Sequence, residues 1–283
     1  MKRVLVTGAN GQLGQCIQEL SVLHSSMKFV FLGSKDLDIT CKDSVFGVFK
    51  NNNIDFCVNC AAYTAVDKAE SEFDLAEKVN VLGVKNLSEA CKENSAKLIH
   101  ISTDFVFDGE SNIPYLENVL LNPISVYGKT KLAGEKIIQE IFSEYFILRT
   151  SWLYSEYANN FVKTMLRLGK ERNVLSVVSD QIGSPTYAKD LAEVIIKIIK
   201  NDFERYGVYH YSNKGVASWY DFAKAVFEIE NSKIKINAIP TTSFPTPAER
   251  PKYSVLDTRK IENSLDLEIP YWRDSLKLAI SKM

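Results

Sequence analysis

Hydrophobic and polar residues along the first 150 positions alternate in blocks of several residues rather than one by one. Five apolar blocks are short and continuous, as in strands that are buried on both faces of a parallel sheet. They cover 3–6, 29–32, 55–60, 97–102 and 146–150. Amphipathic stretches with helical spacing separate them, at 12–23, 44–51, 74–93 and 125–142. The alternation predicts an α/β fold with a Rossmann-type doubly wound parallel sheet and right-handed crossovers.

After residue 150 the alternation of predicted strands and helices becomes less regular. Helical spacing returns at 159–170, 189–200, 218–230 and 272–282, and short strands are predicted at 175–178 and 208–211. A turn-rich stretch at 240–247 interrupts the pattern. We therefore expect a Rossmann domain over 1–150 and a smaller C-terminal lobe, mainly for substrate, over 151–283. Later segments of the chain are free to return to the first domain.

Composition excludes several classes of protein. The 283 residues are 46% hydrophobic and 24% charged, with a formal net charge of -1, which is typical of a globular protein. This charge gives no reason to expect nucleic acid or a membrane surface as a partner. No apolar run approaches the ~20 residues that span a bilayer, and the chain starts directly with a predicted strand. We therefore expect a cytoplasmic protein, and the sequence leaves a homodimer open.

Cysteine and histidine spacing does not indicate a metal site or a disulfide framework. The five cysteines are scattered, and an odd, scattered set does not suggest disulfides. Cys57 and Cys60 form a C-x-x-C, but residues three apart on a strand face opposite sides of the sheet. The three histidines, His24, His100 and His210, do not fall into ligand spacing. We expect no metal.

A glycine-rich turn joins the first predicted strand to the first predicted helix. Its glycines are Gly8, Gly11 and Gly14, spaced G-x-x-G-x-x-G. Gly8 permits a tight turn, Gly11 lets a pyrophosphate approach the backbone, and Gly14 lets the helix pack close to the sheet. The helix N-terminus then offers unpaired N–H groups to phosphates. In this context the turn predicts a dinucleotide-binding site.

The end of the second strand bears on the choice between NADH and NADPH. A site specific for NAD has an acid there for the ribose hydroxyls, whereas this chain has Gly33. Lys35 is placed to meet a 2′-phosphate, but Asp36 and Asp38 follow it closely. The cofactor is therefore expected to be NADPH or NADH, with a slight preference for NADPH.

Two segments further on carry the chemistry of a carbonyl reductase. Tyr127 and Lys131 are four apart, so they share one face of a helix. An adjacent ammonium favours the phenolate and lowers the pKa of a tyrosine, so Tyr127 could give a proton to a carbonyl oxygen. A Y-x-x-x-K pair is common by chance, but Ser102 and Thr103 end a predicted strand at the edge of the sheet where ligands bind. One of these hydroxyls would hydrogen-bond the carbonyl oxygen.

With these motifs the sequence resembles the extended short-chain dehydrogenases/reductases and, within them, the dTDP-4-dehydrorhamnose reductases. The resemblance covers nearly the whole chain. The matching segments are 6–14, 59–70, 102–109, 127–131, 149–154, 180–186, 249–251 and 256–258.

The resemblance implies a role for individual residues. The catalytic residues would be Thr103, Tyr127 and Lys131. The cofactor would be bound by Gly8, Asn10, Gly11, Gln12, Leu13, Gly14, Asp38, Ile39, Ala61, Ala62, Thr64, Tyr127 and Lys131. The nucleotide sugar would be bound by Thr103, Asp104, Phe105, Trp152 and, less directly, Arg250. Three positions depart from the usual pattern: Phe105 stands where a tyrosine is usual, Cys60 where an alanine is usual, and Gly33 where some members have an acid.

The implied reaction is NAD(P)H-dependent reduction of the C4 keto group of dTDP-4-dehydro-L-rhamnose to dTDP-L-rhamnose, in dTDP-rhamnose biosynthesis. Two alternatives remain open. In the first, the protein is an enzyme that reduces another nucleotide-linked keto-deoxysugar. In the second, the chain is a non-catalytic regulatory subunit of the same fold, because a fold does not guarantee a catalytic activity.

Overall fold

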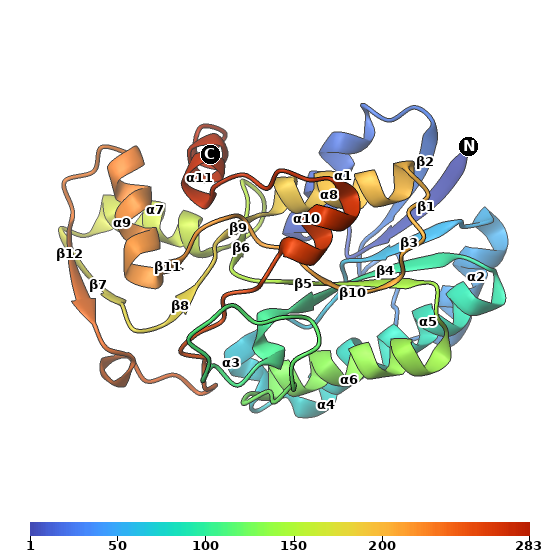
Figure 1. The fold of residues 1–283 in the computed structure, drawn as a ribbon, viewed down its shortest axis with the longest axis horizontal. Helices are drawn as coiled ribbons and strands as arrows, with labels where there is room; N and C mark the ends of the chain where they lie inside the picture. Colours follow the sequence, from blue (N-terminus) through green and yellow to red (C-terminus); the bar gives the residue numbers. More distant parts are fainter.

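A six-stranded sheet runs through the larger of two lobes in the computed structural model, which describes residues 1–283 (Figure 1). All neighbouring strands are parallel, in the order β10-β5-β4-β3-β1-β2. The strands are β1 (Lys2–Thr7), β2 (Met27–Leu32), β3 (Phe56–Asn59), β4 (Lys97–Thr103), β5 (Tyr145–Thr150) and β10 (Gly207–His210). The order reverses between β1 and β3, which is where such sheets bind ligands. The predicted fold class is confirmed.

Helices cover both faces of this sheet, as Figure 1 shows. One layer contains α1 (Gln12–Ser21), α8 (Ala188–Lys200) and α10 (Arg259–Leu265), and the other contains α2 (Lys42–Asn52), α5 (Val84–Glu93) and α6 (Val126–Ile141). Neighbouring strand residues point to opposite faces, so Val4 packs under the first layer and Leu5 under the second. Cys57 and Cys60 likewise pack on opposite faces, and all five cysteines are free.

The smaller lobe has its own core of apolar and aromatic side chains, which includes the fully buried Phe222. Its helices are α7 (Phe161–Glu171), α9 (Trp219–Ile229) and α11 (Trp272–Ile280). Its strands pair as β7 (Val174–Val178) with β12 (Lys235–Ile239), β6 (Leu153–Tyr154) with β9 (Thr186–Tyr187), and β8 (Ile182–Gly183) with β11 (Ala217–Ser218). Only the last pair is antiparallel.

The chain crosses between the lobes more than once. After β5 it enters the smaller lobe, returns to the large sheet with α8 and β10, and then goes back to α9. Residues 188–210 therefore belong to the large sheet and its helix layer although they lie beyond residue 150. Where a domain boundary should be drawn stays a prediction.

Several short elements depart from the predicted pattern. The expected helix at 74–93 is divided into α4 (Phe73–Glu77), a π-helical turn η1 (Lys78–Gly83) and α5. The buried Asn80 lies in that turn and bonds the backbone of Tyr63 and the Thr130 hydroxyl, contacts that helical spacing does not encode. Elements α3 (Val66–Ala69), η2 (Asp104–Val106), η3 (Thr241–Ser243), α10 and β12 were not predicted.

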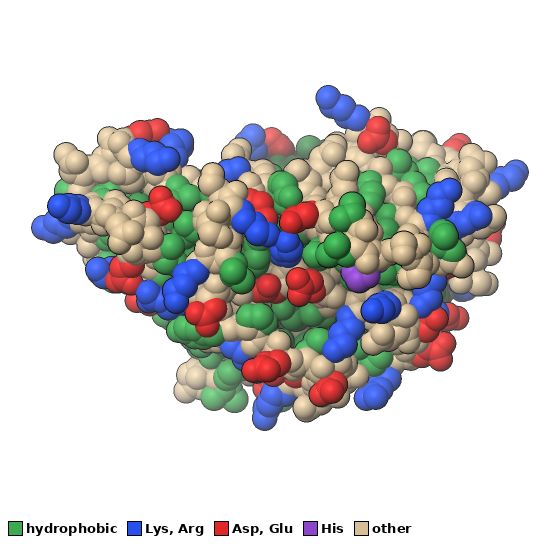
Figure 2. Space-filling view, turned by 90° about the horizontal axis from the view of Figure 1, so that it is seen from above, with side chains coloured by type: hydrophobic (Ala, Val, Ile, Leu, Met, Phe, Trp, Pro, Cys, Tyr) green, Lys and Arg blue, Asp and Glu red, His purple; other side chains and the backbone are tan.

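The surface carries both signs of charge. On the face seen in Figure 2, Lys and Arg side chains are interspersed with Asp and Glu and no large area has a single sign. No helix is both long and apolar enough to cross a bilayer.

Candidate functional site

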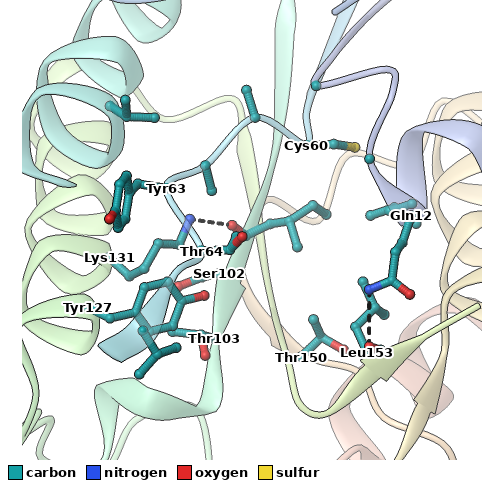
Figure 3. Close-up of a pocket in the computed structure, with 18 of the residues that line it drawn as sticks. Gln12, Cys60, Tyr63, Thr64, Ser102, Thr103, Tyr127, Lys131, Thr150 and Leu153 are labelled. Atoms are coloured by element: carbon teal, nitrogen blue, oxygen red, sulfur yellow. Dashed lines mark hydrogen bonds between the residues drawn. The ribbon is translucent and has the colours of Figure 1, made fainter. Parts of the chain in front are cut away.

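A cleft of about 960 Å³ opens at the carboxyl edge of the sheet, between the two lobes. This volume is at the upper end of the usual range for small-molecule sites. Every residue to which the family resemblance gives a site role lines it. Figure 3 shows the Tyr127 and Lys131 side chains close to Ser102 and Thr103, with Gln12 and Leu153 across the cavity.

The glycine turn is shaped by positions that leave no room for a side chain. Gly8 has a φ of +62°, and a Cβ there would lie 2.6 Å from the backbone nitrogen of Ala61. A Cβ on Gly14 would lie 2.7 Å from Ala9 Cα. The turn therefore brings β1, α1 and the end of β3 into close contact, which only glycine permits at these two positions.

The N-terminus of α1 fits the phosphates of a dinucleotide. Its N-cap is Gly11, which has no side chain to accept from the first N–H groups. Gly11, Gln12, Leu13 and Gly14 all line the cleft, and free N–H groups at a helix N-terminus attract phosphate. Gln12 also donates to the Leu153 carbonyl at 3.3 Å, which links this turn to the smaller lobe.

The segment after β2 supplies an acid but no cation to the cleft. Asp38 lines it, and its carboxylate accepts from the backbone and hydroxyl of Thr40, at 2.9 and 2.7 Å. These bonds hold the pKa of Asp38 below its usual value. Lys35 is exposed and does not line the cleft. The interpretation of Lys35 as a 2′-phosphate ligand therefore gains no support from this structure.

Strand β4 ends at the residues expected to contact the reacting carbonyl. The Thr103 hydroxyl caps η2 by accepting from Phe105 N at 3.2 Å, and it lies 3.0 Å from Asp104 Oδ1. Asp104 is buried, and its Oδ2 has no hydrogen-bond partner. Burial raises the pKa of Asp104 to about 6. The edge therefore offers a hydroxyl and a carboxyl that is readily protonated.

Helix α6 presents Tyr127 and Lys131 to this edge. Ser125 caps the helix by accepting from Gly128 N at 3.2 Å, which places Tyr127 in the first turn. Removal from water and the Asp104 carboxylate raise the pKa of Tyr127 to about 12, while the Thr103 side chain lowers it. Lys131 is not among the groups that shift this pKa here, so its predicted lowering effect on Tyr127 stays a prediction.

Lys131 is almost fully buried and its nitrogen is held by β4. Its Nζ donates to the Ile101 carbonyl at 2.7 Å and lies 3.2 Å from His100 Nε2. Burial lowers the pKa of Lys131 to about 8, and Glu135 and Cys60 act in the opposite direction. The lysine therefore titrates close to neutral pH.

An ion pair supports this helix from beneath. Arg149 on β5 is 2% exposed and donates to the Glu135 carboxylate, with a shortest contact of 2.7 Å. Glu135 is 1% exposed, lies one turn after Lys131 on α6, and also accepts from the Ser102 hydroxyl. The pair ties α6, β4 and β5 together directly behind the catalytic candidates.

Two tryptophans form the wall on the side of the smaller lobe. Trp152 has a φ of +48°, and its ring stacks on Trp219 with centroids 3.7 Å apart and planes 8° from parallel. Gly183 leaves space for the Trp152 ring, since a Cβ there would lie 2.6 Å from it. Trp219 lines the cleft and was not predicted. Its only signal in the sequence is an aromatic residue next to a helix-capping serine, Ser218.

Arg250 reaches the cleft paired to an acid. Its guanidinium makes two contacts with the Asp67 carboxylate, at 2.8 and 2.7 Å, and also donates to Thr246 and Ala248. Asp67 lies in α3 and Arg250 in the segment between β12 and α10, so the pair joins two segments that are 183 positions apart. Arg250 was predicted from the sequence, but its partner was not.

Other cleft residues without a predicted role include Ser34, Tyr63, Val66, Leu75, Thr150, Ser151, Asn159 and Asn160. Tyr63, Val66, Thr150 and Ser151 lie in segments that match the family, but no role was predicted for them. No cluster of His, Cys, Asp or Glu has the composition of a metal site.

A parallel sheet with a glycine turn after β1, hydroxyls at the end of β4 and a Tyr/Lys helix at the same edge defines a short-chain dehydrogenase/reductase. Comparison with known proteins narrows this class. The family model described as "RmlD substrate binding domain" matches residues 1–283. A dTDP-4-dehydrorhamnose reductase from Aggregatibacter actinomycetemcomitans is 44% identical, over 98% of both chains.

Solved structures support the same family assignment. A dTDP-4-dehydrorhamnose reductase from Bacillus anthracis in complex with NADP superposes with a TM-score of 0.96, at 44% identity over 100% of both chains. One from Clostridium acetobutylicum gives a TM-score of 0.94 at 44% identity, covering 99% of this chain and 98% of its own. The chain belongs to the RmlD family of dTDP-4-dehydrorhamnose reductases.

Proposed function

We propose that the protein reduces dTDP-4-dehydro-L-rhamnose to dTDP-L-rhamnose with NADPH or NADH. The observation that carries this proposal is the meeting of Thr103 and Tyr127 in one cleft with a glycine turn, in a chain of this family. The likeness to the NADP complex from Bacillus anthracis supports the cofactor.

The residues present fit the cofactor. Its phosphates would lie on the turn Gly8–Gly14, where the helix N-terminus is uncapped. The rest of the cofactor-binding site would be formed by Asp38, Ile39, Ala61, Ala62, Thr64, Tyr127 and Lys131. When bound, the reduced nicotinamide supplies a hydride to C4 of the sugar. The preference for NADPH over NADH stays open.

Tyr127 supplies the proton. Its raised pKa keeps the phenol protonated at neutral pH, so the Tyr127 O–H bond breaks as an O–H bond forms on the C4 oxygen. The Thr103 hydroxyl, which donates to Asp104 Oδ1 in this structure, would turn its O–H to the C4 oxygen and hold that oxygen beside the phenol. The charge left on Tyr127 is stabilised by the ammonium form of Lys131, and the phenolate regains a proton from water.

The nucleotide sugar would lie against the smaller lobe. Asp104 and Phe105 border the end of β4, and Trp152 faces them from the other lobe. Arg250 would meet the diphosphate, since arginine matches phosphate geometry. Its two contacts with Asp67 hold the guanidinium at the cleft.

The test is loss of nicotinamide absorbance with the 4-keto sugar nucleotide. Replacement of Tyr127 by Phe should lower kcat by roughly 10²–10⁴-fold, which is the usual contribution of a positioned acid. Tyr206→Phe is the matched control, because it removes a phenol hydroxyl outside the cleft and should leave kcat unchanged. An unchanged kcat in Tyr127→Phe, or no turnover by the wild type, would refute the proposal.

The identity of the sugar, the oligomeric state and the location of the protein need experiments of their own. Mass spectrometry and NMR of the product distinguish dTDP-L-rhamnose from a product of another keto-deoxysugar. A homodimer and a cytoplasmic location are expectations from the sequence, checked by sedimentation and by cell fractionation.

A further inference from the structure

A chain of buried polar side chains runs beneath the cleft from β1 to α6. Thr7 Oγ1 donates to Asn59 Oδ1 at 2.7 Å, and Asn59 Nδ2 lies 3.0 Å from His100 Nδ1. His100 Nε2 then lies 3.2 Å from Lys131 Nζ. All four residues are at most 2% exposed, so water does not complete their hydrogen bonds and each contact needs a donor and an acceptor.

The orientation of Asn59 is fixed by a group that only donates. The backbone N–H of Ala61 points at Asn59 Oδ1 at 3.1 Å, and a backbone N–H requires an acceptor. The amide oxygen must therefore face Ala61 and Thr7, which turns the Nδ2 group toward His100. Turning the amide over would make the Ala61 N–H face a second donor and would leave it only the longer contact with the Thr7 hydroxyl, at 3.4 Å.

This orientation determines which nitrogen of His100 carries the proton. Asn59 Nδ2 only donates, so His100 Nδ1 must accept and carries no proton. A neutral imidazole then has its proton on Nε2. Burial and the neighbouring Lys131 hold the pKa of His100 well below its usual value, so the ring stays neutral and its Nε2–H points at Lys131.

An ammonium has three donors and no acceptor, whereas an amine has a lone pair. Lys131 Nζ already donates to the Ile101 carbonyl. With the amine, the Nε2–H of His100 finds an acceptor and every contact in the chain is satisfied. With the ammonium, two donors meet in a buried site, which is costly.

Other titratable groups also surround Lys131. Glu135 on α6 and Cys60 after β3 favour its charged form, whereas burial opposes it. Tyr127 lies one turn away on the same helix. Among these neighbours, only His100 is within hydrogen-bond distance of Nζ and presents a donor to it.

We propose that His100 is a positioning residue that donates from Nε2 to Lys131 and favours the uncharged amine of this lysine. The inference rests on the proposed roles of Tyr127 and Lys131. It implies that the alkaline limb of the kcat profile reports Lys131, because the ammonium stabilises the phenolate left on Tyr127.

The tautomer is measured directly by NMR of the imidazole nitrogens. The chain has only three histidines, so their resonances are separable, and His100→Asn assigns the signal. We expect His100 to remain neutral with its proton on Nε2 throughout the pH range of activity. We also expect the Nε2 shift to follow the titration of Lys131. A proton on Nδ1 would overturn the proposal.

The lysine is measured with ε-13C-labelled protein, in which Lys131→Arg assigns the signal. In His100→Asn, the new side chain can still accept from Asn59 but does not reach Lys131, so the pKa of Lys131 should rise by about one unit or more. His210→Asn is the matched control. His210 is equally buried, but its ring faces Arg149 and Tyr115, so the Lys131 titration should not move.

Asn59→Asp tests the same chain if His100→Asn does not fold. The carboxylate still accepts from Thr7 and Ala61, and its second oxygen now accepts from His100. The imidazole proton should therefore move to Nδ1, and Lys131 should titrate at higher pH. An unmoved Lys131 titration in these variants would overturn the proposal.

Kinetics complete the test. The alkaline limb of kcat should move upward in His100→Asn by the same amount as the Lys131 titration, with little change in the KM for the sugar nucleotide. A uniform fall in kcat without a shift of the limb would indicate a merely structural role and overturn the proposal. Since the NMR measurements need no turnover, they remain informative if Tyr127→Phe refutes the reductase function.

Discussion

Replacement of Glu135 by Leu should destabilise the protein strongly, because it leaves the Arg149 guanidinium buried without its counter-ion. The two side chains are 1% and 2% exposed, so solvent does not replace the lost partner. The remaining neighbours of Arg149 are the neutral His210 ring and the Glu117 carbonyl. Neither carries the compensating negative charge.

The magnitude follows from burial. Removal of one member of a buried ion pair costs ~3–5 kcal/mol. A chain of this length has an unfolding entropy of about 0.6 kcal/mol/K near its midpoint, so Tm should fall by roughly 5–8 °C. The double variant Glu135→Leu/Arg149→Met removes both charges, and it should be less destabilised than Glu135→Leu alone.

Calorimetry or denaturant unfolding of the wild type, both single variants and the double variant measures this difference. The coupling between the two positions should be about 2 kcal/mol or more. Losses that simply add in the double variant would refute the reasoning, because they would mean that the buried charges do not depend on each other.

Three further predictions concern the cleft. Gly8→Ala should abolish the rise in Tm that NADPH produces, because its Cβ would collide with the backbone at Ala61; Gly47→Ala, where a Cβ has nothing within 4 Å, is the control that should keep this rise. Trp219→Ala should raise the KM for the sugar nucleotide about two- to tenfold with little change in kcat, since loss of ring stacking frees Trp152; an unchanged KM would contradict this role. Asp104 has a folded-state pKa of about 6, above the unfolded value, so its contribution to stability is present below pH 4 and is lost as the pH rises through 6. The free energy of unfolding of Asp104→Asn should therefore rise by up to ~3 kcal/mol relative to that of the wild type between pH 4 and pH 7. Parallel curves of stability against pH for the two proteins would exclude this effect of Asp104.

The sequence predicted the large sheet well because its strands are continuous apolar runs between amphipathic helices. It also predicted a common site for the glycine turn, Thr103 and Tyr127, because the carboxyl ends of parallel strands meet at one edge. These features depend on local patterns and on one topological rule.

The rest depends on contacts between distant segments. Asp67 pairs with Arg250 across 183 positions, and Trp219 stacks on Trp152 only after α9 joins the smaller lobe. Burial raises the pKa of Tyr127, and the spacing of Tyr127 and Lys131 in the sequence does not show that the phenol loses water. Strand β12 contains two isoleucines and one alanine beside a lysine and an asparagine, which is too short an apolar pattern to predict a strand.

The most direct test of the central claim follows the hydride itself. The protein is incubated with dTDP-4-dehydro-L-rhamnose and NADPH or NADH in which both hydrogens at C4 of the nicotinamide are deuterium, and the product is examined by NMR and mass spectrometry. We expect dTDP-L-rhamnose with one deuterium at C4 of the sugar, and a strongly reduced yield of this product with Tyr127→Phe in the same reaction time. A product without deuterium at C4, or the same yield from Tyr127→Phe, would contradict it.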